Sequence, residues 1–306
     1  MMKKKSGFYN DIAESLCDLK KYKFLFHAAN WYSPLPSIDT LTNIVDNLKE
    51  ILFPCFIGHY EKQQHTFKYY VSHKLEVIQK LLQEQITRGF CFTCGEKEQD
   101  CKIWEKKSQL LVKRFIKKLP EIRSLLLTDV VAAYNGDPAA KNYGETILCY
   151  PSIVALTYYR IAHELYKLGI ELIPRMITEI SHSKTGIDIH PAATIGEQFF
   201  IDHGTGVVIG ETTIIGKNVR LYQGVTLGAK SFPLDNKGNP VKDIPRHPIL
   251  EDNVIVYSNA TILGRITIGE NAVIGGNIWI TEDVPPNSKI FQNKDMVHIL
   301  ENGAGI

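Results

Sequence analysis

The sequence predicts an α+β protein in which an N-terminal all-α helical domain precedes a left-handed parallel β-helix of hexapeptide repeats with an extruded loop. Three observations predict this fold. Aliphatic residues recur at every sixth position from Ile189 to Ile290, glycine follows many of them, and apolar residues in the first half are spaced three and four positions apart. We therefore divide the chain into a helical domain (1–186), a β-helix (187–290) and a flexible tail (291–306).

The six-residue period contains a single polar residue, Thr213, and one interruption. Its members are Ile189, Ile195, Ile201, Val207, Thr213, Val219 and Val225, followed by Val254, Ala260, Ile266, Ala272, Ile278, Val284 and Ile290. A coil of three short strands repeats in this way, because each unit of six forms one side of a triangular prism and turns its aliphatic side chain inward. Stacking between coils then supplies the stability that one coil lacks.

An irregular segment at 229–250 interrupts the period. It is rich in residues that break regular structure, namely Pro233, Gly238, Pro240, Pro245 and Pro248. Because the count of six restarts only beyond it, at Val254, we expect this segment to leave the prism as a loop.

The helical domain is expected to contain amphipathic helices at 71–86, 104–118, 122–134 and 151–168. Pro120 should separate the second helix from the third, and Gly169 should end the last. Asp137 is followed by a proline, which favours a helix start just beyond it and an N-cap role for the aspartate. We expect this domain to mediate assembly.

The composition is that of a globular protein, with 22% charged residues, 44% hydrophobic residues and a net charge of +2. This balance gives no reason to expect nucleic acid or a membrane surface as a partner. No apolar run approaches the ~18 residues of a spanning helix, and the first residues lack the pattern of a signal peptide. We therefore expect a cytoplasmic protein with reduced cysteines.

Three cysteines lie close together in the helical domain, at Cys91, Cys94 and Cys101. A Cys-x-x-Cys pair is half of a zinc site, and a third thiolate follows it, but a fourth ligand is missing locally. A redox-active dithiol is a second interpretation. Unligated thiols are favoured over both, so no metal is expected.

Polar residues gather at three places in the β-helix. They are Asp188 with His190, Asp202 with His203, and Arg246 with His247 where the irregular segment rejoins the coil. Hexapeptide β-helices usually pack as trimers, so these groups are expected to meet in a groove between neighbouring prisms, with His190 as an ordinary corner residue. A histidine beside carboxylates suits general base catalysis on a hydroxyl group.

Several motifs carry a resemblance to a known family. They are Asp188-Ile-His-Pro-Ala-Ala-Thr-Ile-Gly196, Asp202-His-Gly-Thr-Gly206, Gln223-Gly-Val-Thr-Leu-Gly228, Arg246-His-Pro248, Asp137-Pro-Ala139 and Tyr158-Tyr-Arg-Ile-Ala-His-Glu-Leu165. Together they resemble the serine O-acetyltransferases, hexapeptide-repeat enzymes that open cysteine biosynthesis. The resemblance covers roughly half of the chain, and the first half looks more like a longer branch of the same family.

The resemblance implies transfer of an acetyl group from acetyl-CoA to the hydroxyl of L-serine, without a metal. It implies that His203, oriented by Asp188, takes the hydroxyl proton. Arg246 would hold the serine carboxylate, with His247 reaching in beside it as a catalytic and substrate-binding residue. Two aspartates, Asp137 and Asp202, would hold the ammonium group.

The same resemblance places acetyl-CoA along the later rungs, against Gly228, Ala229, Ser258 and Gly276. At one point the chain departs from the family, since Ser258-Asn259 stands where a small residue followed by glycine is usual. The family also implies a trimer or a dimer of trimers, feedback inhibition by L-cysteine in the serine site, and docking of Ile306 into O-acetylserine sulfhydrylase.

Three other interpretations remain open on the sequence. A hexapeptide acetyltransferase acting on a sugar or antibiotic hydroxyl would share the repeats. A β-helix carbonic anhydrase would need three zinc-binding histidines between subunits, for which His190, His203 and His247 supply the number. A non-catalytic scaffold would recruit a partner through its tail.

Overall fold

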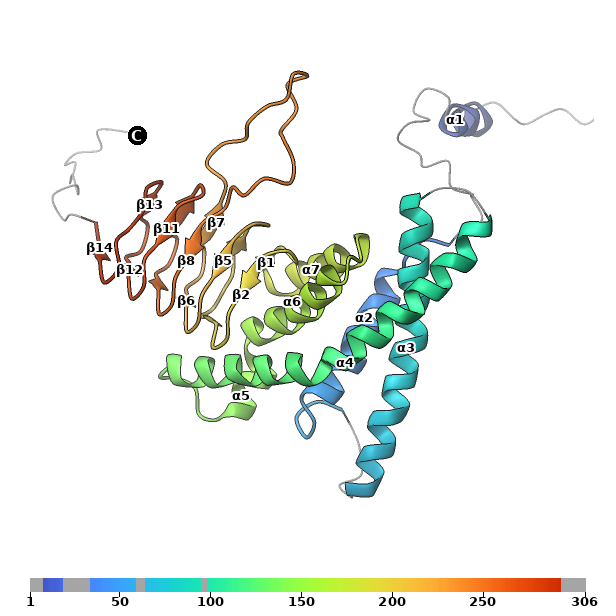
Figure 1. The fold of residues 1–306 in the computed structure, drawn as a ribbon, viewed down its shortest axis with the longest axis horizontal. Coiled ribbons are helices and arrows are strands. Elements are labelled where there is room, and N and C mark those ends of the chain that lie inside the picture. Colours follow the sequence, from blue (N-terminus) through green and yellow to red (C-terminus); the bar gives the residue numbers. More distant parts are fainter. Residues whose placement is uncertain (1–7, 19–33, 59–63, 95–97, 293–306) are drawn as a thin grey trace, which may run out of the picture.

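The computed structural model describes residues 8–18, 34–58, 64–94 and 98–292 (Figure 1). Helices come first, and short strands follow after residue 187. The helices are α1 (Phe8–Cys17), α2 (Ile38–Leu52), α3 (Gln64–Cys94), α4 (Glu98–Gly136), α5 (Tyr143–Cys149), α6 (Pro151–Lys167) and α7 (Leu172–Thr185). Within the described residues, no helix is long and apolar enough to span a membrane.

The two helices expected on either side of Pro120 are a single helix, α4, so that expectation is wrong. Proline inside a helix removes one backbone hydrogen bond and costs about 3 kcal/mol. The flanking side chains of Phe115, Leu119 and Ile122 are all buried in the core. Their burial on both sides of the proline outweighs this cost and carries the helix through to Gly136.

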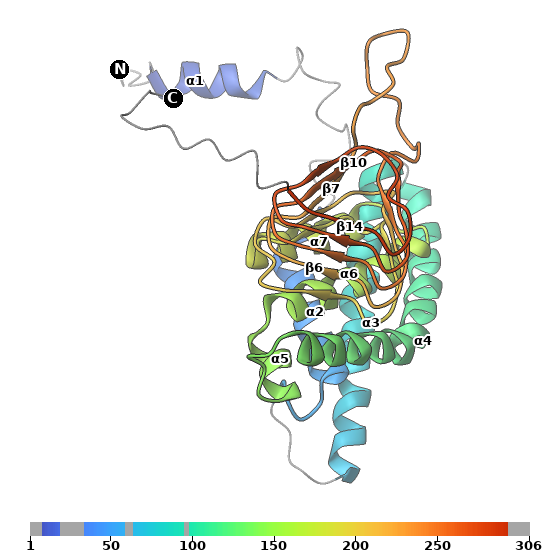
Figure 2. The ribbon, with the colours of Figure 1, turned by 90° about the vertical axis from the view of Figure 1, so that its left-hand side faces the viewer.

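The strands confirm the predicted left-handed parallel β-helix, because they pair in parallel to form three sheets (Figure 2). The first sheet contains β1 (Asp188–Ile189), β4 (Val208–Ile209), β7 (Thr226–Gly228), β10 (Thr261–Leu263) and β13 (Trp279–Ile280). The second contains β2 (Thr194–Ile195), β5 (Ile214–Ile215), β8 (Ile249–Leu250) and β11 (Thr267–Ile268). The third contains β3 (Phe200–Ile201), β6 (Arg220–Leu221), β9 (Ile255–Val256), β12 (Val273–Ile274) and β14 (Lys289–Ile290).

The aliphatic column inside the prism runs differently from the simple count of six. Strands β1, β2 and β3 begin six residues apart, but the corner between β3 and β4 is two residues longer. The column that starts at Ile189 therefore continues at Ile209, whereas Val207 belongs to a second buried column. The longer corner contains Asp202 and His203, so the repeat is broken where these polar residues lie.

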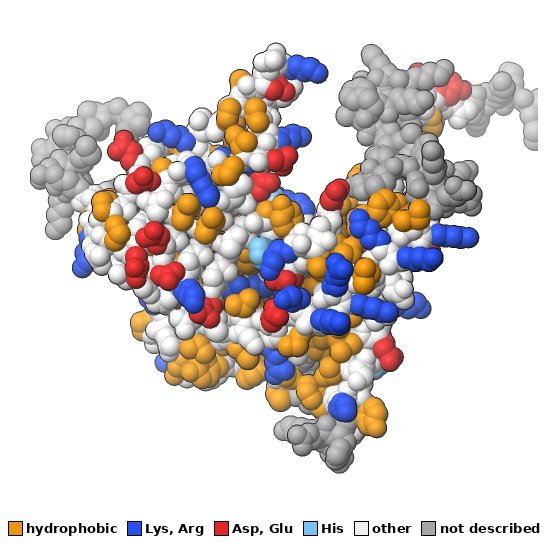
Figure 3. Space-filling view, in the orientation of Figure 1, with side chains coloured by type: hydrophobic (Ala, Val, Ile, Leu, Met, Phe, Trp, Pro, Cys, Tyr) orange, Lys and Arg blue, Asp and Glu red, His pale blue; other side chains and the backbone are white. Residues whose placement is uncertain are grey.

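The irregular segment leaves the prism as predicted. After β7 the chain runs out as an arm and returns to β8, with an antiparallel bridge between Leu234 and Pro240 (Figure 1). Hydrophobic side chains lie along the arm, where Phe232 and Leu234 are exposed (Figure 3).

The first coil forms one end of the prism, so its outward-facing backbone carbonyls have no neighbouring strand to pair with. Side chains of α6 bind them instead. The Tyr159 hydroxyl donates to the Ala193 carbonyl at 2.5 Å, and Arg160 donates to the carbonyls of Ile195 and Gly196 at 3.3 and 2.8 Å. Helix α6 is thereby fixed to the β-helix.

A buried ion pair joins α4 to the same place. Arg160 Nε and Nη2 donate to the two carboxylate oxygens of Asp129, at 2.6 and 2.8 Å. One oxygen of Asp129 also accepts the backbone N–H of Phe199 at 3.1 Å. Only 4% of the Arg160 side chain and none of the Asp129 side chain is exposed. The pair therefore holds α4, α6 and the first coil in one arrangement.

We expect Arg160→Met to destabilise the folded chain by about 3–5 kcal/mol, because it leaves the Asp129 carboxylate buried and unpaired. Chemical denaturation at a fixed protein concentration measures this loss. Lys118→Met is the control, since it removes an ion pair with Glu121 on the surface of the same helix α4. Equal unfolding midpoints for the two variants would contradict the role assigned to the pair.

Candidate functional site

Most of the predicted polar residues, together with some that were not predicted, form two groups in the single chain, at the two ends of β4. The first group, here called the His203 cluster, consists of Asp137, Tyr150, Asp202 and His203 and precedes the strand. The second, the His247 cluster, consists of Glu211, Thr212, Arg246 and His247 and adjoins the strand's far end, whereas Asp188 of β1 pairs with Val208 at the start of the strand. Basic and acidic side chains lie next to a histidine in the middle of the face shown in Figure 3.

His203 lies on the long corner between β3 and β4. Its backbone is left-handed, with φ of 55°, and the two glycines beyond it, Gly204 and Gly206, also have positive φ. Left-handed backbone recurs at other corners of the prism, where asparagine usually adopts it, so the conformation suits a tight corner and does not by itself distinguish this one. The corner turns the imidazole outward: 72% of the side chain is exposed, and Nε2 lies 3.7 Å from Asp202 Oδ1.

Asp137 comes to this corner through a close packing of α4 on β3. A Cβ atom on Gly136 would lie 2.7 Å from the ring of Phe200, so only glycine permits the approach. Asp137 follows directly and is not an N-cap, contrary to the expectation. The N-cap of α5 is Asn142, whose side chain accepts the Glu145 N–H at 3.0 Å.

The carboxylate of Asp137 is held by two donors. The Tyr150 hydroxyl donates to Oδ2, and the backbone N–H of Ala139 donates to Oδ1 at 2.8 Å. The Tyr150 hydrogen bond, followed by that of Ala139, holds the pKa of the Asp137 carboxyl below its usual value, with a smaller contribution from His203. Asp137 therefore carries a negative charge beside His203 and Asp202. Tyr150 was not predicted from the sequence.

The His247 cluster is assembled where the arm rejoins the prism. Arg246 Nη2 donates to Glu211 Oε2 at 2.5 Å, and both residues line a small pocket of about 280 Å³ at the base of the arm. Asp188 lies on the outer face of β1, where its Oδ1 is 3.9 Å from Arg175 of α7. Glu211 and Arg175 were also not predicted.

The geometry around His247 defines its tautomer. Thr212 accepts the backbone N–H groups of Arg246 and His247 at its hydroxyl oxygen, at 2.9 and 3.1 Å. Its own backbone N–H donates to Nδ1 of His247 at 3.1 Å. Nδ1 is therefore an acceptor, and the ring proton resides on Nε2. Burial, together with the charge of Arg246, lowers the pKa of His247 to about 4, so the ring is neutral near pH 7.

Two residues outside the predicted set keep His247 in place. A Cβ atom on Gly210 would lie 2.0 Å from Cδ2 of the imidazole, so the ring occupies the space that a side chain would need. Arg265 donates to the carbonyls of Thr212 and His247 at 2.6 and 3.0 Å. The end of the arm is thus anchored to the coil beneath it.

The residues expected to bind acetyl-CoA lie at the two ends of the strands in the first sheet, some before a strand and some after one. Ser258 and Gly276 stack on successive coils, since a Cβ atom on Gly276 would lie 3.1 Å from the Ser258 carbonyl. Gly228 is the last residue of β7, at the other end of the strands, and Ala229 begins the arm. Ile306 lies outside the described residues, so the contact expected of it stays a prediction.

Asp188 and His203 have different partners in the single chain, namely Arg175 and Asp202. Among the described residues of the single chain, one set of possible metal ligands lies close together, Glu179, His182 and Asp188, whereas the histidines of the carbonic anhydrase interpretation would meet only between subunits. The side chains of Cys94 and Cys101 lie outside the described part of the chain.

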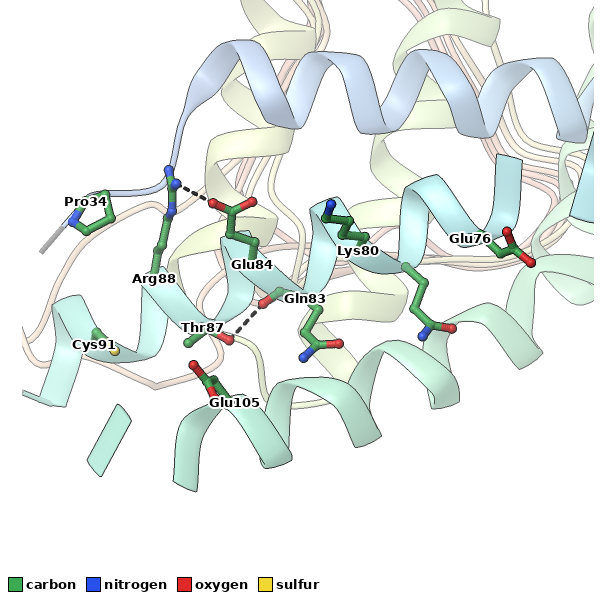
Figure 4. A pocket seen from close by; sticks show the side chains of 10 residues that line it. Pro34, Glu76, Lys80, Gln83, Glu84, Thr87, Arg88, Cys91 and Glu105 are labelled. Atoms are coloured by element: carbon green, nitrogen blue, oxygen red, sulfur yellow. Dashed lines mark hydrogen bonds and ion pairs between the residues drawn. The ribbon is translucent and has the colours of Figure 1, made fainter. Parts of the chain in front are cut away.

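A larger cavity of about 730 Å³ lies away from both clusters, in the helical part (Figure 4). Residues of α3 line most of it, together with Pro34 and Glu105. Arg88 forms an ion pair with Glu84 in the wall of the cavity. The other side chains that line the cavity are mostly polar (Figure 4). Cys91 lines this cavity, but none of the residues predicted to act in catalysis or to bind serine or acetyl-CoA does.

A parallel β-helix with an extruded arm, and with histidines and carboxylates at the corners of adjacent coils, is the architecture of hexapeptide-repeat acyltransferases. A scan against protein-family models found no match. A plasmid serine acetyltransferase of Synechococcus elongatus is 48% identical over 278 residues, which cover 90% of this chain and 87% of the relative. The chain belongs to the serine acetyltransferase family.

Solved structures support the same assignment. Serine acetyltransferase 1 of Entamoeba histolytica, in complex with L-cysteine, is 36% identical with a TM-score of 0.72, over 92% of this chain and 94% of the other. The soybean enzyme, complexed with serine, is 28% identical with a TM-score of 0.54, over 84% of this chain and 98% of its own.

The lowered pKa of His247 makes the stability of the fold depend on pH. The unfolded chain takes up this proton near pH 6.5, but the folded chain does so only near pH 4. Stability should therefore fall as the pH is lowered through this window, by about 2 kcal/mol between pH 7 and pH 5. Denaturation midpoints measured across this range should fall less steeply for His247→Gln, and identical slopes would contradict the assigned burial.

Proposed function

We propose that this chain transfers the acetyl group of acetyl-CoA to the hydroxyl of L-serine and produces O-acetyl-L-serine and CoA. One observation carries the proposal. In a chain of this family, the long corner between β3 and β4 exposes the His203 imidazole beside Asp202 and near the carboxylate of Asp137. This is the arrangement that an amino alcohol needs, with a base for its hydroxyl and negative charge for its ammonium group.

His203 acts as the general base in this mechanism. Its imidazole accepts the proton of the serine hydroxyl while the oxygen attacks the thioester carbonyl carbon. The carbon–sulfur bond then breaks, and the imidazolium returns the proton to the leaving thiolate of CoA. In this mechanism the imidazole is oriented by Asp188 of a neighbouring subunit. Within one chain Asp188 lies beside Arg175 and His203 lies beside Asp202, so the two residues are not paired there.

Serine is bound from both clusters. Asp137 and Asp202 accept hydrogen bonds from its ammonium group, and Arg246 binds its carboxylate through the guanidinium. His247 is neutral near pH 7 because its pKa is lowered to about 4, so its Nε2–H serves as a donor rather than as a base. Donation from Nε2–H suits either the serine carboxylate or the oxygen that becomes negative during acyl transfer.

A trimer explains why the two clusters lie at the two ends of β4. When triangular prisms pack side by side, one corner of each prism faces another corner of its neighbour. The His203 cluster of one subunit then faces the His247 cluster of the next, and three grooves each contain one complete site. Acetyl-CoA lies in the same groove, along the backbone at Gly228, Ala229, Ser258 and Gly276.

L-Cysteine is proposed as a feedback inhibitor of this site. It carries the ammonium and carboxylate groups of serine and differs only in having a thiol in place of the hydroxyl. The related Entamoeba histolytica enzyme is known in complex with L-cysteine. Inhibition should therefore be competitive with serine.

The proposal is tested by following the release of free CoA from acetyl-CoA with and without L-serine. His203→Asn should lower the serine-dependent rate by about a hundredfold or more, the usual effect of losing a general base. Asparagine tolerates left-handed backbone, so the corner should keep its shape and the unfolding midpoint should change little. CoA release that does not depend on serine would reject the substrate, and full activity in the variant would reject the base.

A second variant tests His247 without changing it. Gly210→Ala should displace the imidazole, since the new methyl group would lie 2.0 Å from its Cδ2 atom. We expect serine-dependent activity to fall by about tenfold or more, as removal of one positioned donor does. Gly89→Ala in α3 is the matched control, because there the added Cβ meets Ile173 at an ordinary 3.5 Å. Equal activity in the two variants would exclude a role for the position of His247.

A further inference from the structure

Tyr150 connects Asp137, the aspartate proposed to bind the substrate, to helix α6, which is hydrogen-bonded to the first coil of the β-helix. It lies between α5 and α6, and is at once the residue that ends α5 and the N-cap of α6. Its backbone N–H donates to the Thr146 carbonyl at 3.3 Å, and its carbonyl accepts from Ile153 at 3.1 Å. Pro151 follows and restricts the backbone further.

Hydrogen bonds link Asp137, through Tyr150 and α6, to the β-helix. Helix α6 begins at Pro151 and is fixed to the first coil of the β-helix by Tyr159 and Arg160. Asp137 itself lies in the loop that joins α4 to the short helix α5. The hydroxyl of Tyr150, which donates to Asp137 Oδ2, therefore ties this loop to the coil that leads to His203.

The charges around Tyr150 keep its hydroxyl a donor. Burial, followed by the hydrogen bond to Asp137 and the nearby carboxylates, raises the pKa of Tyr150 far above its usual value. The phenol is therefore protonated throughout the range in which an enzyme is assayed. Each oxygen of Asp137 accepts one protein hydrogen bond and has a second lone pair to offer an ammonium group.

We propose that Tyr150 is a positioning residue for recognition of the substrate's amino group, acting through Asp137. This inference rests on the proposed function and adds a determinant of specificity to it. Tyr150 orients the Asp137 carboxylate so that its free lone pairs face the space beside His203 and Asp202. Substrates that carry an ammonium group next to the hydroxyl carbon benefit from this orientation, and alcohols without one do not.

Tyr150→Phe removes the hydroxyl and keeps the ring. We expect the KM for L-serine to rise about tenfold, the usual effect of losing one hydrogen bond to a charged group. The kcat and the KM for acetyl-CoA should stay within about twofold of the wild type, since neither depends on the amino group. Cysteine should inhibit the variant more weakly, by a similar factor.

Two comparisons separate positioning from a general loss of structure. The first is 3-hydroxypropanoate, which is serine without its amino group, and its KM should be the same for the wild type and Tyr150→Phe. The second is Asp137→Asn, in which adding Tyr150→Phe should cause little further loss. Tyr143→Phe is the matched control, because it removes a half-exposed hydroxyl from the neighbouring helix α5 and should leave every constant unchanged.

The outcomes distinguish this inference from the function on which it rests. If the wild type neither binds nor acetylates serine, in calorimetry and in the CoA assay, the proposed function fails and takes the inference with it. If the wild type acetylates serine and Tyr150→Phe has an unchanged KM for it, only the role of Tyr150 is rejected. An equal rise in KM for serine and for 3-hydroxypropanoate would likewise reject it.

Discussion

The arrangement of helices α4 and α6 on the β-helix depends on the buried ion pair between Arg160 and Asp129. An ionised pair this deeply buried is stable only when its remaining hydrogen-bonding groups are also satisfied. Here the carbonyls of the first coil and the N–H of Phe199 satisfy them. The pair therefore forms only when α4, α6 and the prism are together, and this requirement places Asp137, at the end of α4, beside the corner that contains His203.

The sequence was sufficient to predict the architecture because the period of six depends on local spacing alone. The extruded arm was predicted for the same reason, since prolines and glycines break that spacing. The prediction of a helix break at Pro120 was wrong because the burial of Leu119 and Ile122 outweighs the helix-breaking effect of proline. That burial depends on helices far away in the sequence. The prediction that Asp137 is an N-cap was wrong for a similar reason. Its partner Tyr150 lies thirteen residues further on, beyond an intervening helix.

The candidate site was only partly predictable, for an identifiable physical reason. Motifs indicated Asp188, His203, Arg246 and His247, but the side chains that orient them follow no spacing. Glu211 and Arg246 are 35 residues apart and meet only because the arm returns to its starting coil. One signal was available and missed: the aliphatic column continues from Ile201 at Ile209, and this gap of eight marks the corner on which His203 lies.

The prism is fixed at its first coil and has no comparable helical covering on the described coils after β11. Each coil rests on the one before it, and the residues of both clusters lie on the first coils, at the base of the arm and, for Asp137 and Tyr150, on either side of α5. Whole coils added or removed beyond β13 would leave the residues of both clusters, and the backbone at Gly276, unchanged. The length of the β-helix is therefore free to vary in steps of one coil, while the spacing between α6 and the arm is not.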